Sequence, residues 1–211
     1  MKLNPAAFNR FLAHMGQSVL WRASFVCPCT QEHSGAAETN CPICKGKGLT
    51  WGAPVGSVVG VTSQSVNAKT ESFGAMEAGD VTLTLPGDMP IYAAGRFDRV
   101  TLLNATDVFS RALTMGAGNS LADLAVQSIT RVFWRSLDKT TLIEGGLPVV
   151  NPDGSLTWAA NPPAPGTQYS INGVAFNDYF IFEALPTDRA EHQGAPLPRR
   201  VQARKWDLLG R

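Results

Sequence analysis

Residues 27–48 read CPCTQEHSGAAETNCPICKGKG and contain all four cysteines of the chain. The cysteines form two close pairs, Cys27-x-Cys29 and Cys41-x-x-Cys44, with eleven residues between the pairs. Four thiolates in two close pairs are a frequent donor set of structural zinc sites. Because this segment has almost no bulky apolar side chains, it cannot fold by burial, and we expect a bound Zn²⁺ to order it as a zinc knuckle.

Several features of the segment bear on the kind of site it forms. Gly46 and Gly48 allow a tight turn that brings backbone amides to the sulfurs, and Lys45 and Lys47 would offset the charge of a zinc tetrathiolate. The eight residues CPICKGKG resemble one repeat of the zinc domain of DnaJ-type chaperones, which implies a similar turn. Four thiolates leave no open position for a catalytic water, so a structural site is expected.

Other chemistry for the segment stays open. His33 lies inside the loop and could replace one cysteine as a ligand. Two disulfides, four free thiols or an iron–sulfur cluster are further alternatives. A chain kept in a reducing cytoplasm favours metal binding over disulfides.

The residues before the knuckle, 1–26, predict a short helix and a strand. Asn4 followed by Pro5 is typical of a helix start, and Gly16 of a helix end. Between them, Phe8, Phe11, Leu12 and Met15 share one helix face. A helix of three turns is marginal alone, so we expect this face to dock on its own body or on a neighbouring subunit. Residues 17–26 alternate between apolar and more polar side chains, as in a strand.

The residues after the knuckle, 49–185, predict a β body. Short segments rich in Val, Thr, Ile, Phe and Tyr are separated by turn signals, including Asp153-Gly154 and Asn172-Gly173. This spacing indicates a barrel or a sandwich, so the fold class is mainly β. The segment 104–126 mixes helix and loop signals and stays undecided. The expected strands are 56–66, 79–85, 97–103, 127–136, 141–144, 155–159, 168–174 and 178–184.

The last segment, 186–211, has little apolar material before Trp206 and predicts an extended, basic C-terminal arm. From Pro196 to Arg211 there are four arginines and one lysine against one aspartate, a net charge of +4. Trp206 either folds back on its own domain or anchors in a pocket of a partner subunit, as aromatic residues often do. The candidate partner contacts are Arg199, Arg200, Arg204, Lys205, Trp206, Leu208 and Leu209.

Composition and motifs limit the function further. The 211 residues carry a net charge of +1, whereas dedicated nucleic-acid binders usually show a strong basic excess. No apolar stretch approaches the ~20 residues of a membrane span, and the N-terminus lacks the apolar run of a signal peptide. Nucleophile-elbow, zinc-protease and phosphate-loop motifs do not occur. We therefore expect a protein that is not an enzyme and has no membrane partner.

The order of helix, cysteine knuckle, β body and basic tail resembles small neck or head–tail connector proteins of tailed bacteriophages. The resemblance rests on the zinc segment and the last 60 residues, including Pro162–Tyr169, Phe182–Arg189 and Leu197–Leu208. It implies a virion protein, assembled in the host cytoplasm, that forms a collar or head-closure ring of its own copies. Its partners would be other neck, portal or tail proteins, and DNA would pass through the ring without sequence-specific binding.

Two other functions are weighed beside this one. The knuckle and the basic tail could form a zinc-dependent nucleic-acid-binding module, or the chain could belong to another part of the tail or baseplate. An enzyme is the remaining alternative.

Overall fold

The computed structural model describes residues 4–63, 79–116, 120–185 and 190–209. The chain is mainly β, with about 50% strand and 10% helix. It divides into two compact units, one formed by residues 1–104 with 178–211 and the other by residues 105–177. Strands β6 (Arg99–Thr114) and β11 (Gln168–Ala184) contribute residues to both units.

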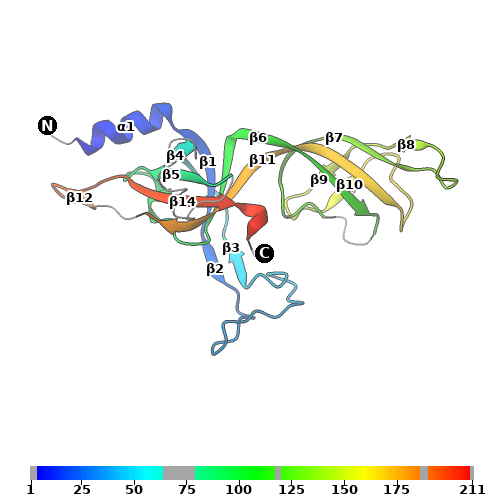
Figure 1. Cartoon of the computed structure of the whole chain (residues 1–211), viewed down its shortest axis with the longest axis horizontal. Helices are drawn as coiled ribbons and strands as arrows, with labels where there is room; N and C mark the ends of the chain where they lie inside the picture. Colours follow the sequence, from blue (N-terminus) through cyan, green and yellow to red (C-terminus); the bar gives the residue numbers. More distant parts are fainter. Residues whose placement is uncertain (1–3, 64–78, 117–119, 186–189, 210–211) are drawn as a thin grey trace. The chain divides into compact units, whose positions relative to one another are not determined.

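The first unit is a closed barrel of six antiparallel strands, in the order β14-β5-β4-β1-β6-β11 and back to β14 (Figure 1). Closure comes from β14, which pairs with β5 on one side and with β11 on the other. A closed barrel leaves no free strand edge. Besides β6 and β11, its strands are β1 Gln17–Arg22, β4 Val55–Ser63, β5 Val81–Leu85 and β14 Arg199–Lys205.

Aliphatic side chains from every barrel strand are buried in this unit. Each fully buried Val, Leu or Ile side chain contributes about 1.5–3 kcal/mol relative to an exposed one. A short 3-10 helix, Pro90–Ala93, adds the buried Ile91. The strand residues with an exposed fraction of 2% or less include Val19, Val59, Leu83, Leu85, Val100, Leu102, Ile181, Val201 and Ala203.

The predicted N-terminal helix is confirmed as α1, Pro5–Met15. The Asn4 side chain caps it by accepting a hydrogen bond from the Ala7 N–H at 3.1 Å. Gly16 is required at the helix end, because a Cβ there would lie 2.4 Å from the Leu12 carbonyl oxygen. Of the apolar face, Leu12 is buried and packs close to Gly60 of β4, whereas Phe8, Phe11 and Met15 are exposed. This helix does not meet the length and apolarity that a membrane span requires, and it is the only α-helix of the described residues.

The second unit has its own small core under a twisted sheet. In it, β11 pairs with β7 (Ala125–Arg135), and β7 pairs with β8 (Leu142–Glu144). The predicted Asp153-Gly154 hairpin is confirmed, since β9 (Pro148–Val150) pairs with β10 (Leu156–Trp158) and Gly154 has a φ of +80°. The fully buried residues of this core are Leu121, Val132, Tyr169 and Ile171.

All eight expected segments contain strands, but one predicted turn is wrong. Asn172-Gly173 does not separate two strands; β11 runs from Gln168 to Ala184, and its register with β7 shifts at these two residues. Gly173 is needed for close packing, because a Cβ there would lie 2.3 Å from the Ser128 carbonyl oxygen. In the undecided segment 104–126, β6 continues as far as Thr114 and β7 begins at Ala125. Residues 64–66 of the expected strand 56–66 lie outside the described residues.

The prediction of an extended C-terminal arm is wrong over most of its length. Residues 191–192 (β12) and 195–196 (β13) form a small hairpin, and Arg199–Lys205 is the barrel strand β14. The 3-10 helix η3, Trp206–Leu208, follows it. The physical reason is that Val201 and Ala203 are buried in the barrel, while Arg204 pairs with the buried Asp80 at 3.2 Å. Residues 186–189 and 210–211 lie outside the described residues.

The turn between β7 and β8 leads to a prediction about pH. Hydrogen bonds from Ser136 and Thr140 lower the pKa of the exposed Asp138 carboxyl from 3.8 to about 2. A depressed pKa means that the carboxylate stabilises the turn above about pH 4 and that this contribution is lost as the pH falls through about 2. An NMR titration should show the Thr140 amide shifting with this low midpoint, and Asp138→Asn should abolish that titration. A midpoint near 3.8 would contradict the hydrogen-bonded turn.

Candidate metal centre

The cysteine segment lies at the end of a two-stranded ribbon that extends from the barrel (Figure 1). The predicted strand 17–26 is divided at Ala23 into barrel strand β1 and ribbon strand β2, Ser24–Val26. Strand β3, Leu49–Trp51, pairs with β2 from Ser24↔Trp51 to Val26↔Leu49. The Cys27 N–H donates to the Gly48 carbonyl oxygen at 2.8 Å, which closes the base of the intervening loop.

The structure brings all four predicted ligands together. The Sγ atoms of Cys27, Cys29, Cys41 and Cys44 all lie within 4.8 Å of one another. The distance is 3.8 Å from Cys27 to Cys41 and 3.5 Å from Cys29 to Cys44, and all four cysteines are free. Disulfide sulfurs would be about 2.05 Å apart. Three of the side chains are buried and Cys29 is half-buried, so the four sulfurs form a small, mostly enclosed site that can hold one metal ion.

Turns with left-handed backbone conformations place the second cysteine pair. The Lys45 N–H donates to the Cys41 carbonyl oxygen at 2.9 Å, and the Lys47 N–H donates to that of Cys44 at 3.1 Å. Lys45, Gly46 and Gly48 have φ values of +52°, +82° and +71°. Glycine suits positions 46 and 48 because it adopts positive φ without a Cβ penalty. The tight turn expected from Gly46 and Gly48 is therefore present.

The environments of two thiols differ. Burial raises the pKa of the Cys29 thiol to about 12; a hydrogen bond with the Glu38 backbone acts against this, whereas hydrogen bonds with the other three thiols act in the same direction as burial. Burial also acts to raise the pKa of Cys44, but hydrogen bonds from the backbone of Gly48 and Gly46 and from two neighbouring thiols lower it to about 7. Because these thiols share hydrogen bonds, they titrate as a group rather than one by one. Because metal ligands must be deprotonated, metal affinity should fall as the pH decreases.

His33 does not belong to this cluster. It is exposed, and the sulfur cluster contains only the four cysteines. The arrangement therefore favours the four-cysteine ligand set over the alternative in which His33 replaces one thiolate.

A buried carboxylate fixes the root of the ribbon to the barrel. Asp98 is 4% exposed and accepts hydrogen bonds from the Trp21 Nε1–H, the Ser24 N–H, the Ser24 hydroxyl and the Gly95 N–H at 2.8–2.9 Å. The Trp51 Nε1–H also donates to the Phe97 carbonyl oxygen at 3.0 Å. These bonds join both ribbon strands to the loop that precedes β6.

Trp206 lies between the barrel and the cysteine segment. It is 5% exposed, and its ring meets that of Trp51 edge-on at a centroid distance of 4.7 Å. The Arg99 guanidinium lies 4.3 Å from the Trp206 ring centroid, and the Lys47 ammonium lies 5.0 Å from it. Of the two interpretations of Trp206, the structure favours folding back on its own domain. Lys47, expected to offset the thiolate charge, also contacts this ring.

The other predicted partner contacts lie on β14 and just after it. Arg199 and Arg204 are half-buried and make contacts within their own unit, and Leu208 and Leu209 are also half-buried. Arg200 and Lys205 are exposed. Contact of these residues with a partner subunit stays a prediction.

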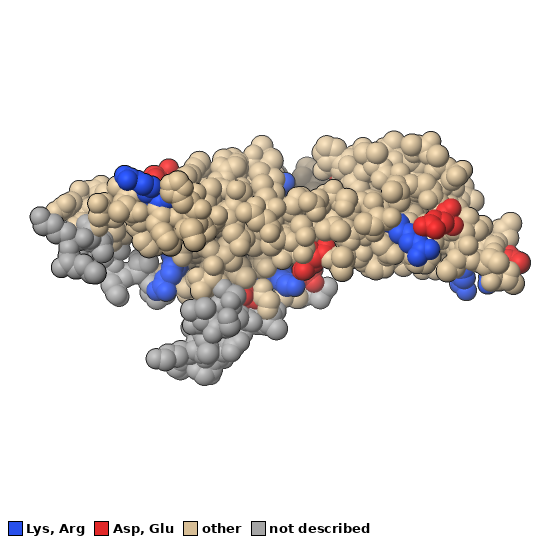
Figure 2. Space-filling model, turned by 90° about the horizontal axis from the view of Figure 1, so that it is seen from above, with Lys and Arg blue, Asp and Glu red and all other residues tan. Residues whose placement is uncertain are grey.

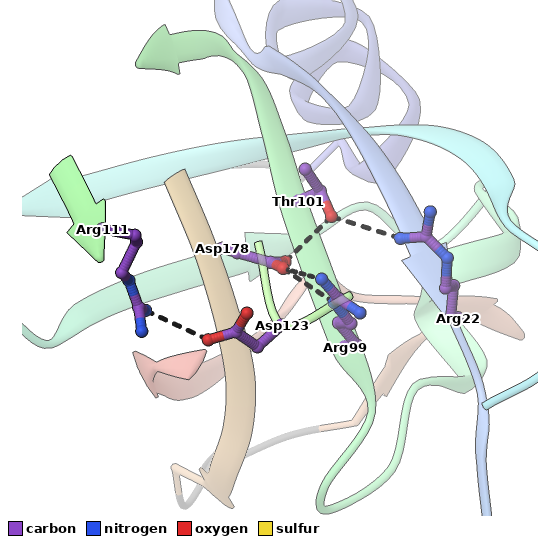
Figure 3. A network of polar contacts seen from close by, with 6 residues as sticks. All are labelled: Arg22, Arg99, Thr101, Arg111, Asp123 and Asp178. Carbon is purple, nitrogen blue, oxygen red and sulfur yellow. Dashed lines mark hydrogen bonds and ion pairs between the residues drawn. The ribbon is translucent and has the colours of Figure 1, made fainter. Parts of the chain in front are cut away.

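A network of polar side chains near Trp206 was not predicted from the sequence. Figure 3 shows Asp178 accepting from Arg99 Nε at 2.7 Å and from the Thr101 hydroxyl at 2.8 Å, while Arg22 donates to Thr101 at 3.2 Å. Burial and the positive charge of Arg99 lower the pKa of Arg22. The figure also shows an ion pair of the second unit, Arg111–Asp123, at 3.0 Å. Like Asp98, Asp178 lies 74–79 residues from most of its partners, so local patterns could not identify it.

No protein-family model matches this chain, and a search of the curated proteins finds no significant match.

Proposed function

We propose that the chain is a structural protein whose cysteine ribbon is stabilised by one Zn²⁺. The observation that carries this proposal is the cluster of four Sγ atoms within 4.8 Å. In a tetrahedral site with Zn–S bonds of about 2.3 Å, neighbouring sulfurs lie about 3.8 Å apart. The distances of 3.8 and 3.5 Å are close to this value. Zinc prefers such a set of four thiolates in structural sites.

The energetics support a structural role for the metal. Within the loop, the bulky aliphatic side chain of Ile43 is 68% exposed, so burial contributes little to folding there. Zinc binding to small modules contributes on the order of 10–16 kcal/mol, which is comparable to the 5–15 kcal/mol that stabilises a whole domain. The metal is thus sufficient to order residues 27–48. Four thiolates also saturate the ion and leave no position for a substrate or water.

We further propose that this protein forms a ring in the neck of a tailed bacteriophage, between portal and tail. The sequence resemblance motivates the proposal, and three structural features support it. The barrel is closed, and the exposed Phe8, Phe11 and Met15 of α1 suit contact with another subunit. On the face in Figure 2, basic and acidic side chains occur in small scattered groups, some mixed and some of one sign, which suits a neutral subunit better than a nucleic-acid binder.

Solution mass and particle location test the assembly role. We expect the zinc-loaded chain to form a symmetric oligomer in mass photometry, or to be a stable component of purified particles at the head–tail junction. A monomer that is absent from particles would contradict the proposal. If that monomer bound DNA with an affinity that falls steeply with salt, the nucleic-acid-binding alternative would be favoured instead.

A further inference from the structure

The barrel unit contains an open pocket that is separate from the cysteine cluster. It has a volume of about 470 Å³ and is lined by the loop Ala94–Gly95–Arg96, by residues 181–184 of β11, and by Arg199 and Val201 of β14. Small-molecule sites commonly have volumes of 300–1,000 Å³. The pocket is therefore large enough for a small ligand.

Two segments at this pocket, the loop that ends at Phe97 and strand β11, have irregular backbone. Phe97, directly after the loop, has a φ of +69°, which is strained for an aromatic residue. It is held there by its N–H, which donates to the Ile181 carbonyl oxygen at 2.7 Å. On the facing strand, the register of β11 with β14 shifts between Ile181 and Glu183, which places a bulge at Phe182. Bulges and strained residues are frequent beside binding sites.

Two arginine side chains are held at the pocket by aromatic rings. The Arg96 guanidinium lies 4.8 Å from the Phe97 ring centroid and 5.7 Å from that of Phe182. The Arg199 guanidinium lies 5.5 Å from the Tyr92 ring centroid and donates to the Ala94 carbonyl oxygen. Such stacking fixes the planar donor groups of arginine in advance of binding.

Neither of these arginines has a carboxylate partner among the residues that the structure describes. Elsewhere in the barrel, Arg99 pairs with Asp178 and Arg204 pairs with Asp80. Within the described part of the chain, the Arg199 Nε is buried without a hydrogen-bond acceptor. A buried donor without a partner costs about 1–3 kcal/mol, so the hydrogen bonds of the Arg199 side chain are not complete within its own unit.

The charged side chains at the pocket favour an anion with several acceptor oxygens. Glu183 also lines it but is exposed, and no ion pair joins it to either arginine among the described residues. Two guanidiniums (+2) and one carboxylate (−1) give these side chains a net charge of +1, which attracts an anion, and the two guanidiniums favour an anion with several acceptor oxygens. Phosphate groups carry about −1.5 to −2 charges at pH 7 and offer three acceptor oxygens, to which arginine binds well.

We propose that the pocket between Arg96 and Arg199 binds a phosphate dianion, either free phosphate or the phosphate of a small monoester. This site depends neither on the zinc nor on the assembly role. Arg96 and Arg199 supply the donors, while Phe97, Phe182 and Tyr92 hold them in place.

Titration of the zinc-loaded full chain at constant ionic strength tests this proposal. Calorimetry should detect binding of inorganic phosphate and of adenosine 5′-monophosphate, but not of acetate at the same concentration. Arg96→Ala and Arg199→Lys should each weaken phosphate binding about tenfold or more, as expected for loss of a charge-assisted hydrogen bond. Glu183→Gln should strengthen it, because it removes a like charge. Tighter binding of adenosine 5′-monophosphate than of inorganic phosphate would identify a monoester as the ligand. Tighter binding of inorganic phosphate would identify free phosphate instead.

Arg200→Ala is the matched control, because Arg200 is exposed on the same strand and does not line the pocket. It should leave the phosphate affinity unchanged. Since Arg96 is exposed, its variant tests the site even if Arg199→Lys perturbs folding. The proposal is overturned if phosphate does not bind, if acetate binds equally well, or if Arg200→Ala weakens binding as much as Arg96→Ala. Tighter, Arg96-dependent binding of a DNA duplex without terminal phosphates would instead assign the pocket to phosphodiesters.

Discussion

Replacement of Cys44 with Ser is expected to release the metal and to unfold residues 27–48 while the barrel stays folded. Substitution of residues that only hydrogen-bond to metal ligands already reduces metal affinity about 10–100-fold. Loss of a direct ligand should therefore weaken zinc binding more than about 100-fold. The loop has little apolar burial to replace this energy, since Ile43 is 68% exposed. The barrel core involves other residues, including Val59, Leu83 and Val201. Metal analysis after dialysis and limited proteolysis should show both effects.

His33→Ala provides the matched control for this experiment. His33 lies in the same loop but is exposed and outside the sulfur cluster, so its replacement should retain about one zinc per chain. Equal loss of zinc in His33→Ala and Cys44→Ser would restore the alternative in which histidine is a ligand. Unchanged protease resistance in Cys44→Ser would contradict the structural role of the metal.

Replacement of Trp206 with Ala is expected to destabilise the barrel unit by about 3–5 kcal/mol, the usual cost of deleting a buried tryptophan side chain. The variant removes the edge-on contact with Trp51 and the contacts with Arg99 and Lys47. Denaturant unfolding of the zinc-loaded protein measures this loss of stability.

Lys205→Ala serves as the control, because Lys205 is the exposed neighbour of Trp206. It should change the unfolding free energy by less than about 0.5 kcal/mol. If Trp206→Ala left the stability unchanged but dissociated an oligomer, Trp206 would act as an anchor on a partner subunit, and its buried position in this structure would not hold in the assembly.

Local signals in the sequence predicted the parts of the fold that depend on neighbouring residues. The helix start at Asn4 and Pro5, the Asp153-Gly154 hairpin and the cysteine cluster each involve residues within about 20 positions. In such cases turn chemistry and ligand spacing determine the structure. The mainly β class followed from short segments rich in Val, Thr, Ile, Phe and Tyr that are separated by turn signals, and a barrel was one of the two architectures expected.

The parts that were missed depend on distant partners. Asn172-Gly173 has the composition of a turn, but Phe109 and Ser128 pack against Gly173 and keep β11 continuous. The sequence RRVQARK, residues 199–205, suggested a solvated arm. In the barrel, however, Val201 and Ala203 are buried, and Asp80, more than 120 residues away, pairs with Arg204. Periodicity alone could not reveal that partner.

X-ray absorption spectroscopy of the purified full-length protein tests the central claim most directly. The claim is that Cys27, Cys29, Cys41 and Cys44 bind one Zn²⁺ as a closed structural site. We predict about one zinc per chain with four sulfur neighbours at about 2.3 Å and no nitrogen or oxygen in the coordination shell. A different metal, less than about half a zinc per chain, or a shell with a nitrogen or oxygen ligand would contradict the claim.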